Sequence, residues 1–155
     1  MAIGFRRFSG RSLGLFALSV FFACAPAPRI SLQYGTELKQ AEIDKVLAEN
    51  PLGASENIKM TTLGQGLSVS HHVVQIRDRE NPHLHKLHDG TVVMVKGHGY
   101  LMIENRRLDL SVGDIVYIPR GAVHYFVNTA SEPTVAFVVF SPPFDGKDTV
   151  PAERP

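Results

Sequence analysis

Histidines and a carboxylate are concentrated in one short stretch of this chain. His83 and His85 stand two residues apart, so on a β-strand both imidazoles would leave the same face. His88 and Asp89 follow shortly after. Imidazole and carboxylate groups are common ligands of divalent metals. The stretch therefore favours a metal site, although an isolated His-x-His pair would more often be a chance pairing on a polar strand face.

A second stretch, downstream of the first, strengthens the metal hypothesis. Its glycines, proline, histidine and asparagine are Gly113, Pro119, Gly121, His124 and Asn128. Together the two stretches resemble the two motifs of the cupin superfamily, G-x5-H-x-H-x3,4-E-x6-G and G-x5-P-x-G-x2-H-x3-N. The second motif matches at every fixed position. The resemblance covers roughly residues 63 to 140, and two spaced motifs in the right order are a specific signal.

The first motif departs from the family pattern at two positions. His83, His85 and Gly97 match, but Gly90 stands where the family has its metal-binding Glu, and Arg77 replaces the leading Gly. Because Gly90 has no side chain, a fourth protein ligand must come from a neighbouring residue or be absent.

The resemblance implies that His83, His85 and His124 converge inside a β-barrel on one divalent transition metal. Asn128 belongs to the second motif without being a ligand. Three neutral imidazoles suit Fe, Mn, Ni, Cu, Co or Zn, and the ligand type does not choose among them. An open coordination position would then be available to a small-molecule ligand.

Asp89 and His88 are the two candidates for the missing fourth ligand. We favour Asp89 because a carboxylate replaces the charge of the lost Glu. Strand alternation, however, turns Asp89 away from the face of Gly90, whereas His88 has the parity of Gly90. A solvated turn histidine is an equally good interpretation of His88.

The pattern after Gly53 predicts an all-β fold, a single cupin-type β-barrel or jelly roll preceded by a short N-terminal helix. Short β-rich pieces separated by turn residues are typical of barrels and sandwiches. The apolar spacing over Thr36–Asn50 predicts the helix, with Thr36 as its cap and Pro51 after it. The expected strands are 58–63, 67–77, 83–86, 91–96, 99–103, 106–110, 115–118, 124–128 and 134–140.

Several other side chains have alternative interpretations. We expect His71 and His72 on a surface strand, with one facing away from the barrel, and His98 exposed at a turn. Gln75 and Arg77 share a face, so they line a pocket or face solvent. The strand parity of three further residues turns their side chains toward the interior; these are Val92, Met94 and Phe126. Phe144, an aromatic residue of the C-terminal segment, is suited to plugging the barrel edge.

The N-terminus resembles an export signal. Residues 1–23 combine early arginines with an apolar run that is too short to span a bilayer. Cys24, the single cysteine, stands where a bacterial lipobox has its lipid-modified residue; the alternative is an ordinary signal cut near Ala25–Ala27. We therefore expect a signal peptide over 1–23, a tether over 24–35, a helical lead-in over 36–53, the barrel over 54–148 and a tail over 149–155.

This organisation predicts a lipid-anchored protein of the bacterial cell envelope, held in the periplasm by its N-terminal lipid. Nothing in the charge pattern indicates nucleic-acid binding. The first functional hypothesis is a metal-dependent cupin enzyme acting on a small oxygen-bearing metabolite. The alternatives are a non-catalytic ligand-binding or sensing lipoprotein and a barrel that has lost its metal. A homodimer paired through sheet edges, as is common among cupins, is a further expectation.

Overall fold

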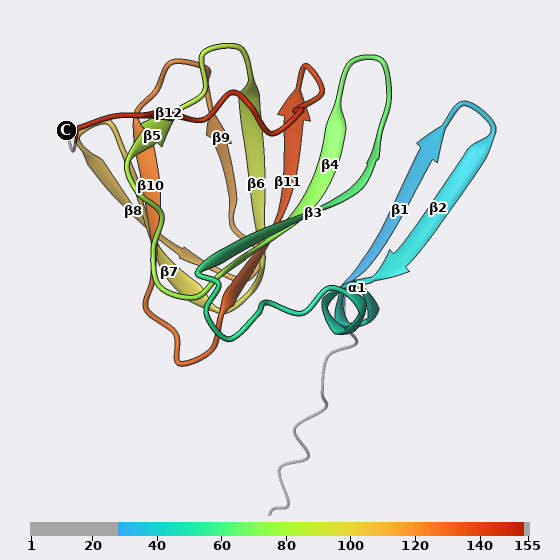
Figure 1. Ribbon diagram of the computed structural model, residues 1–155, viewed down its shortest axis with the longest axis horizontal. Helices are drawn as coiled ribbons and strands as arrows, with labels where there is room; N and C mark the ends of the chain where they lie inside the picture. The colour runs from blue at the N-terminus through green and yellow to red at the C-terminus, as the bar shows by residue number, and fades with distance from the viewer. Residues whose placement is uncertain (1–27, 154–155) are drawn as a thin grey trace, which may run out of the picture.

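The computed structural model describes residues 28–153, in which two β-sheets face each other and enclose a core (Figure 1). One sheet has the order β12-β5-β10-β7-β8 and the other β3-β4-β11-β6-β9. The strands of the first sheet are β5 (His83–Leu84), β7 (His98–Ile103), β8 (Arg106–Ser111), β10 (His124–Asn128) and β12 (Val150–Pro151). Those of the second are β3 (Ile58–Gln65), β4 (Ser70–Ile76), β6 (Asp89–Lys96), β9 (Ile115–Ile118) and β11 (Thr134–Ser141). The expected all-β jelly roll with a short helix is confirmed.

The core lies between the two sheets. Strand β11 shows why, because its side chains alternate between two apolar environments. Ala136, Val138 and Phe140 face the interior cluster, whereas Val135 packs in a second cluster on the outside of the sheet. The interior cluster consists of Ile76, Met94, Leu101, Leu110, Ile118, Ala122, Phe126, Ala136, Val138, Phe140 and Phe144.

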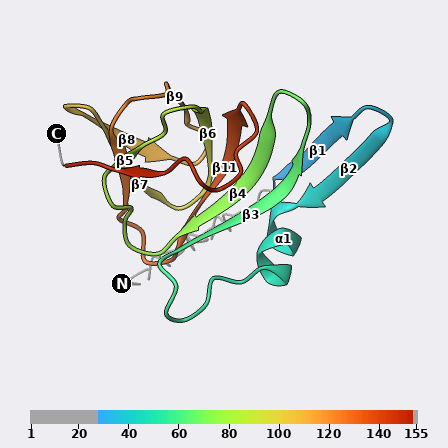
Figure 2. The ribbon, with the colours of Figure 1, turned by 45° about the horizontal axis from the view of Figure 1, so that its top comes forward.

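The segment before the barrel differs from the expected helix. A hairpin of β1 (Arg29–Tyr34) and β2 (Glu37–Glu42) precedes helix α1, which spans only Ile43–Glu49 (Figures 1 and 2). The helix expected from Thr36 is therefore wrong in its first half. Gly35, at a φ of 59°, allows the tight turn that pairs the two strands. Part of the expected tether thus belongs to this hairpin.

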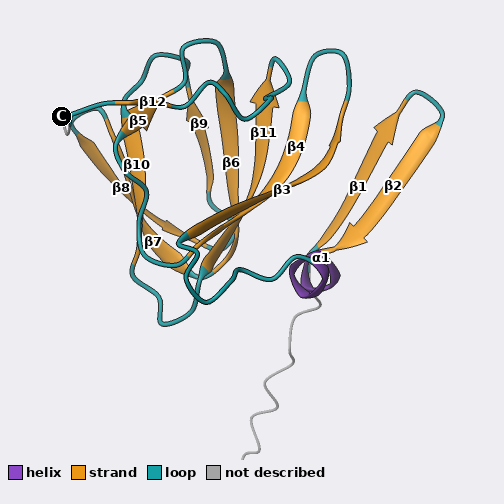
Figure 3. Cartoon of the chain, in the orientation of Figure 1, coloured by secondary structure: helices purple, strands orange, loops and turns teal. Residues whose placement is uncertain are grey.

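Helix α1 packs against the outer face of the second sheet. Ile43 and Val46 are buried there against Val73 and Val135. Figure 3 shows α1 as a short purple coil at the base of the hairpin. Within residues 28–153, no helix has the length and apolar character needed to cross a membrane. Residues 1–23 and Cys24 lie outside the described residues.

The expected barrel strands are present with shifted ends. Strand β4 begins at Ser70 because residues 66 to 69 form a turn, closed by a hydrogen bond from the Gly66 N–H to the Val69 oxygen (2.8 Å). Strand β12 was not expected, since the C-terminal residues were interpreted as a tail. The C-terminal segment that leads to it crosses back over the barrel (Figure 1), and β12 pairs with β5, with Val150 opposite Leu84.

Candidate metal centre

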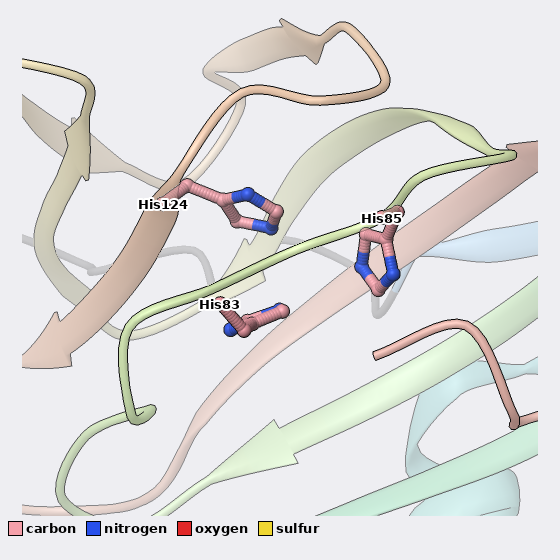
Figure 4. A group of neighbouring side chains, drawn as sticks. All are labelled: His83, His85 and His124. Carbon is pink, nitrogen blue, oxygen red and sulfur yellow. The ribbon is translucent and has the colours of Figure 1, made fainter. Parts of the chain in front are cut away.

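Three imidazoles meet at one end of the barrel interior. His83 lies on β5, His85 follows that strand, and His124 begins β10 directly opposite His83 in the antiparallel pairing. One nitrogen from each ring lies within 4.8 Å of the other two. Figure 4 shows the three rings gathered around a common space. The His-x-His spacing and the cross-strand pairing together create this cluster.

Backbone carbonyl groups fix the tautomer of all three rings. Each Nδ1–H donates to a carbonyl oxygen, and an oxygen acceptor requires the proton to be on Nδ1. The Nε2 of each neutral ring therefore keeps its lone pair. Such outer hydrogen bonds are how metal-binding histidines are oriented in proteins, so these residues fit a divalent transition metal. The acceptors are the oxygens of Asn81 for His83 (2.8 Å), Asp148 for His85 (2.5 Å) and Ala122 for His124 (2.9 Å).

Burial favours the neutral form of two of these rings. Burial, with a further contribution from neighbouring His83, lowers the pKa of His124 to about 4. Burial also lowers the pKa of His85. Because a protonated imidazole cannot bind a metal, rings that are neutral near pH 7 are competent ligands without first losing a proton.

A cavity of about 460 Å³ lies between the sheets and is lined by the three histidines. Most of its wall is aliphatic or aromatic, including Val92, Met94 and Phe126, as their strand parity predicted. The other polar lining side chains are Glu80, Asn81, Thr134 and Thr149. Among the described lining residues there is no Lys or Arg. Concave, mostly apolar spaces with a few polar groups are typical of small-molecule sites.

Glu80 is the functional candidate that the sequence interpretation missed. Its Oε2 accepts a hydrogen bond from the Phe126 N–H (2.9 Å), and its own N–H donates to the Phe126 oxygen (2.9 Å). This pairing with β10 holds the carboxyl group at the cavity wall. Burial raises the pKa of Glu80, although His83 and the Phe126 N–H act in the opposite direction. No motif signals this residue, because it precedes His83 and reaches the site only through its contact with β10.

The structure does not bring Asp89 to the three histidines. Its Oδ2 forms an ion pair with Arg120 Nη2 (2.6 Å), and its Oδ1 accepts the Arg120 backbone N–H (2.9 Å). Hydrogen bonds from Arg120 lower the pKa of Asp89 to about 2. Gly90, the next residue, lines the cavity. Strand alternation thus turns Asp89 away from the cavity, as its parity relative to Gly90 predicted, and Asp89 does not join the three histidines as a ligand.

His88 is buried but is also outside the group of three. Its Nδ1–H donates to Asp148 Oδ2 (2.7 Å). The same carboxylate accepts the backbone N–H groups of Lys86 (3.0 Å) and Leu87 (2.7 Å). These hydrogen bonds outweigh burial and lower the pKa of Asp148 to about 2. Asp148 therefore holds the segment 85–88, and its carbonyl oxygen orients His85.

The C-terminal segment also covers the site. Phe144 is 7% exposed, and its ring stacks on Phe140 at 4.6 Å between centroids. It also contacts His85 edge-on at 5.3 Å. Phe144 thus folds back onto the barrel, as its aromatic bulk suggested.

The paired histidines of β4 have different environments. His72 is 0% exposed and forms hydrogen bonds with Thr62 (3.1 Å) and Ser70 (2.7 Å), so a surface position is wrong for this residue. His71 lies on the outer side, where its Nδ1 is 2.6 Å from the Tyr34 hydroxyl. Hairpin β1-β2 covers His71, and this hairpin was not expected from the sequence.

Gln75 and Arg77 hold the loop before β3 and do not line the cavity. Gln75 donates to the Asn50 oxygen (2.8 Å), and Arg77 donates to the Gly53 oxygen (2.9 Å). His98 is exposed, as expected. Asn128 donates to carbonyl oxygens including that of Arg77 (2.7 Å) and has a structural role.

A two-sheet β-barrel with three inward-facing histidines defines a class of small β-proteins suited to binding a metal and a small molecule in their interior. Comparison with known proteins identifies the family. Residues 70–140 match the family model described as "Cupin domain". An uncharacterised protein of Aquifex aeolicus (strain VF5) is 39% identical over 112 residues, which are 72% of this chain and 91% of that protein. The chain belongs to the cupin superfamily.

Solved structures support the fold. KdgF from a Halomonas species has a TM-score of 0.56 and 24% identity over 63% of this chain and 91% of its own. Streptomyces Pac13, described as a nucleoside dehydratase, has a TM-score of 0.54 and 18% identity over 63% of this chain and 80% of its own. At this level of identity the similarity shows the shared barrel alone.

Proposed function

We propose that this protein is a metal-binding cupin of the cell envelope that binds or transforms a small oxygen-bearing metabolite. The observation that carries the proposal is the orientation of His83, His85 and His124. All three donate Nδ1–H to a backbone carbonyl and so leave Nε2 free beside a common cavity. A bound divalent metal would supply Lewis-acid chemistry toward a ligand oxygen.

Glu80 favours an enzyme over a purely binding protein. Catalysis commonly requires a side chain that holds or moves a proton beside the reacting group, and the carboxyl of Glu80 lines the same cavity as the histidines. Its raised pKa brings it closer to the range in which a carboxyl group exchanges protons at neutral pH. Solved cupins that include the dehydratase Pac13 share the fold.

The alternative is a non-catalytic cupin lipoprotein that captures or senses its ligand. The small number of ionisable groups in the cavity favours it, because Glu80 is the only carboxyl group among the described lining residues. For both functions, the arginines of the N-terminus and Cys24 support a location in the envelope.

The metal content of the purified protein tests the proposal. We expect about one first-row transition metal ion per chain by elemental analysis, since three oriented imidazoles form a metal site. The double variant His83→Ala/His124→Ala should carry almost none. His98→Ala is the matched control, because His98 is exposed and begins β7, whereas the other end of that strand pairs with His124. Equal metal content in the double variant and the control would refute the metal centre.

A further inference from the structure

The cavity also restricts the chemical class of the ligand. Resting on the proposed function, we propose that the site takes a ligand with an uncharged apolar body, of the size of a substituted aromatic ring, and an oxygen-bearing head that reaches the histidines. A sugar acid or another densely hydroxylated anion would not fit this wall. The reasons are the hydrogen-bonding capacity, charge and shape of the lining.

Few wall groups have a free hydrogen-bonding atom. Thr134 lines the cavity, but its hydroxyl donates to Asn128 Oδ1 at 2.6 Å. Asn81 and Thr149 are exposed residues. Below this exposed rim, the polar groups that face a ligand are the buried His85 and His124 and the half-buried His83 and Glu80, all from segments 80–85 and 124. Every sugar hydroxyl placed against the remaining wall would lose its water without gaining a partner, and each such loss would weaken binding by about fivefold to 150-fold.

The charge of the wall disfavours anions. Arg77 is engaged with backbone carbonyl groups and Arg120 with Asp89, while Arg79, next to Glu80, is exposed and does not line the cavity. The one ionisable side chain in the wall besides the histidines is acidic Glu80. A carboxylate or phosphate on the ligand body would therefore be buried without a cationic side chain, which is strongly unfavourable.

The shape of the cavity favours an apolar body. Gly90 lies in the wall where a side chain would otherwise project, and a Cβ there would first meet the Phe140 ring at 3.6 Å. Part of the entrance is apolar as well, because Ile58 and Met60 on β3 line the cavity while remaining 41% and 39% exposed; the exposed Asn81 and Thr149 are its polar part. A volume of about 460 Å³ is within the range of small-molecule cavities.

Binding of a graded series of probes tests this inference. The full mature chain is loaded with zinc, which does not oxidise the probes, and titrated with catechol, 4-methylcatechol, 4-tert-butylcatechol and gluconate by calorimetry. We expect affinity to rise about fourfold for each added carbon, since a buried methylene contributes about 0.8 kcal/mol. Gluconate should bind at least about tenfold more weakly than 4-tert-butylcatechol. Equal affinity across the alkyl series, or tighter binding of gluconate, would overturn the ligand class.

A variant pair and a metal-free sample separate this inference from the metal centre. Gly90→Leu should weaken 4-tert-butylcatechol binding by about tenfold or more without changing the zinc content, because the side chain fills the cavity. Gly90→Ala is the control and should change affinity by less than about threefold. The alkyl dependence should persist in metal-free protein. Zinc binding with no alkyl dependence refutes the ligand class alone, and alkyl dependence without zinc binding refutes the metal centre alone.

Discussion

Replacing Asp148 should loosen the segment that carries His85, although the two residues lie far apart in the sequence. The Asp148 carboxylate accepts hydrogen bonds from the Lys86 and Leu87 N–H groups and from His88 Nδ1–H. Its backbone carbonyl oxygen accepts from His85 Nδ1–H. Asp148→Ala removes the two carboxylate oxygens that accept the first three hydrogen bonds and keeps the backbone acceptor. The variant therefore tests whether the C-terminal segment holds the segment that carries His85.

The expected loss of stability follows from these three hydrogen bonds. A hydrogen bond to a charged group contributes about 1.5–3 kcal/mol, and a buried donor without an acceptor costs a similar amount. The His88 side chain is 7% exposed and Asp148 9% exposed, so water replaces this bond poorly. The two backbone N–H groups belong to exposed residues, where water offsets much of the loss. We expect Asp148→Ala to lower the free energy of unfolding by about 3 kcal/mol.

The pH dependence has a definite sign. The folded-state pKa of Asp148 is about 2, below the value of about 3.9 for an unfolded chain. The carboxylate therefore stabilises the fold above the unfolded pKa, and this contribution is lost as pH falls from about 4 toward 2. Asp148→Ala should lack this part of the acid dependence.

Denaturant unfolding of the metal-free protein between pH 2 and pH 7 measures both effects. Asp145→Ala is the matched control, since Asp145 lies in the same segment but its side chain is 62% exposed; a change of less than about 0.5 kcal/mol is expected. Competition with a chelator should also show metal affinity reduced by about tenfold or more, as for other outer-shell partners. An Asp148→Ala protein as stable as the control, with the same acid dependence as wild type, would contradict this account.

Two further predictions concern Glu80 and Cys24. Side-chain carbon NMR of metal-free protein should show one glutamate, missing in Glu80→Gln, that titrates above the ordinary value; because a raised pKa costs stability as pH rises, Glu80→Gln should increase the Tm at pH 8 and change it little at pH 4. If no glutamate titrates above the usual range, Glu80 does not have the proposed environment. Under the proposed lipid anchor, Cys24→Ser should move the protein from the membrane to the soluble envelope fraction, since lipidation requires the thiol; an unchanged distribution would favour an ordinary secretory signal.

Strand alternation and the resemblance to the two cupin motifs were together sufficient to predict the barrel and its histidines. His83 and His85 share a strand face because alternation has a period of two. Motif spacing placed His124 on a second strand, and the structure pairs it with His83. The inward positions of Val92, Met94 and Phe126 followed from the same alternation. The alternation depends on residues close together in the chain, whereas the meeting of His124 with His83 was implied by the resemblance to the cupin motifs.

The predictions of the helix and the tether were less accurate, because local propensity does not determine the structure of this segment. The apolar spacing from Leu38 onward fits a helix, yet Leu38 lies on β2 opposite Gln33. The turn at Gly35 and the contact of Tyr34 with His71 stabilise the hairpin instead. Tertiary contacts of this kind override the modest preference of a short segment for a helix.

The remaining parts of the site are decided by contacts between residues far apart in the chain. The sequence by itself determined the β-barrel class and the three imidazoles, because strand parity puts His83 and His85 on one face and the resemblance to the two cupin motifs adds His124. Only the tertiary structure decided that Asp89 pairs with Arg120, that Glu80 lines the cavity, and that Asp148 orients His85. Each of these contacts depends on which loops come together when the two sheets pack. No periodic pattern along the chain predicts which loops these are.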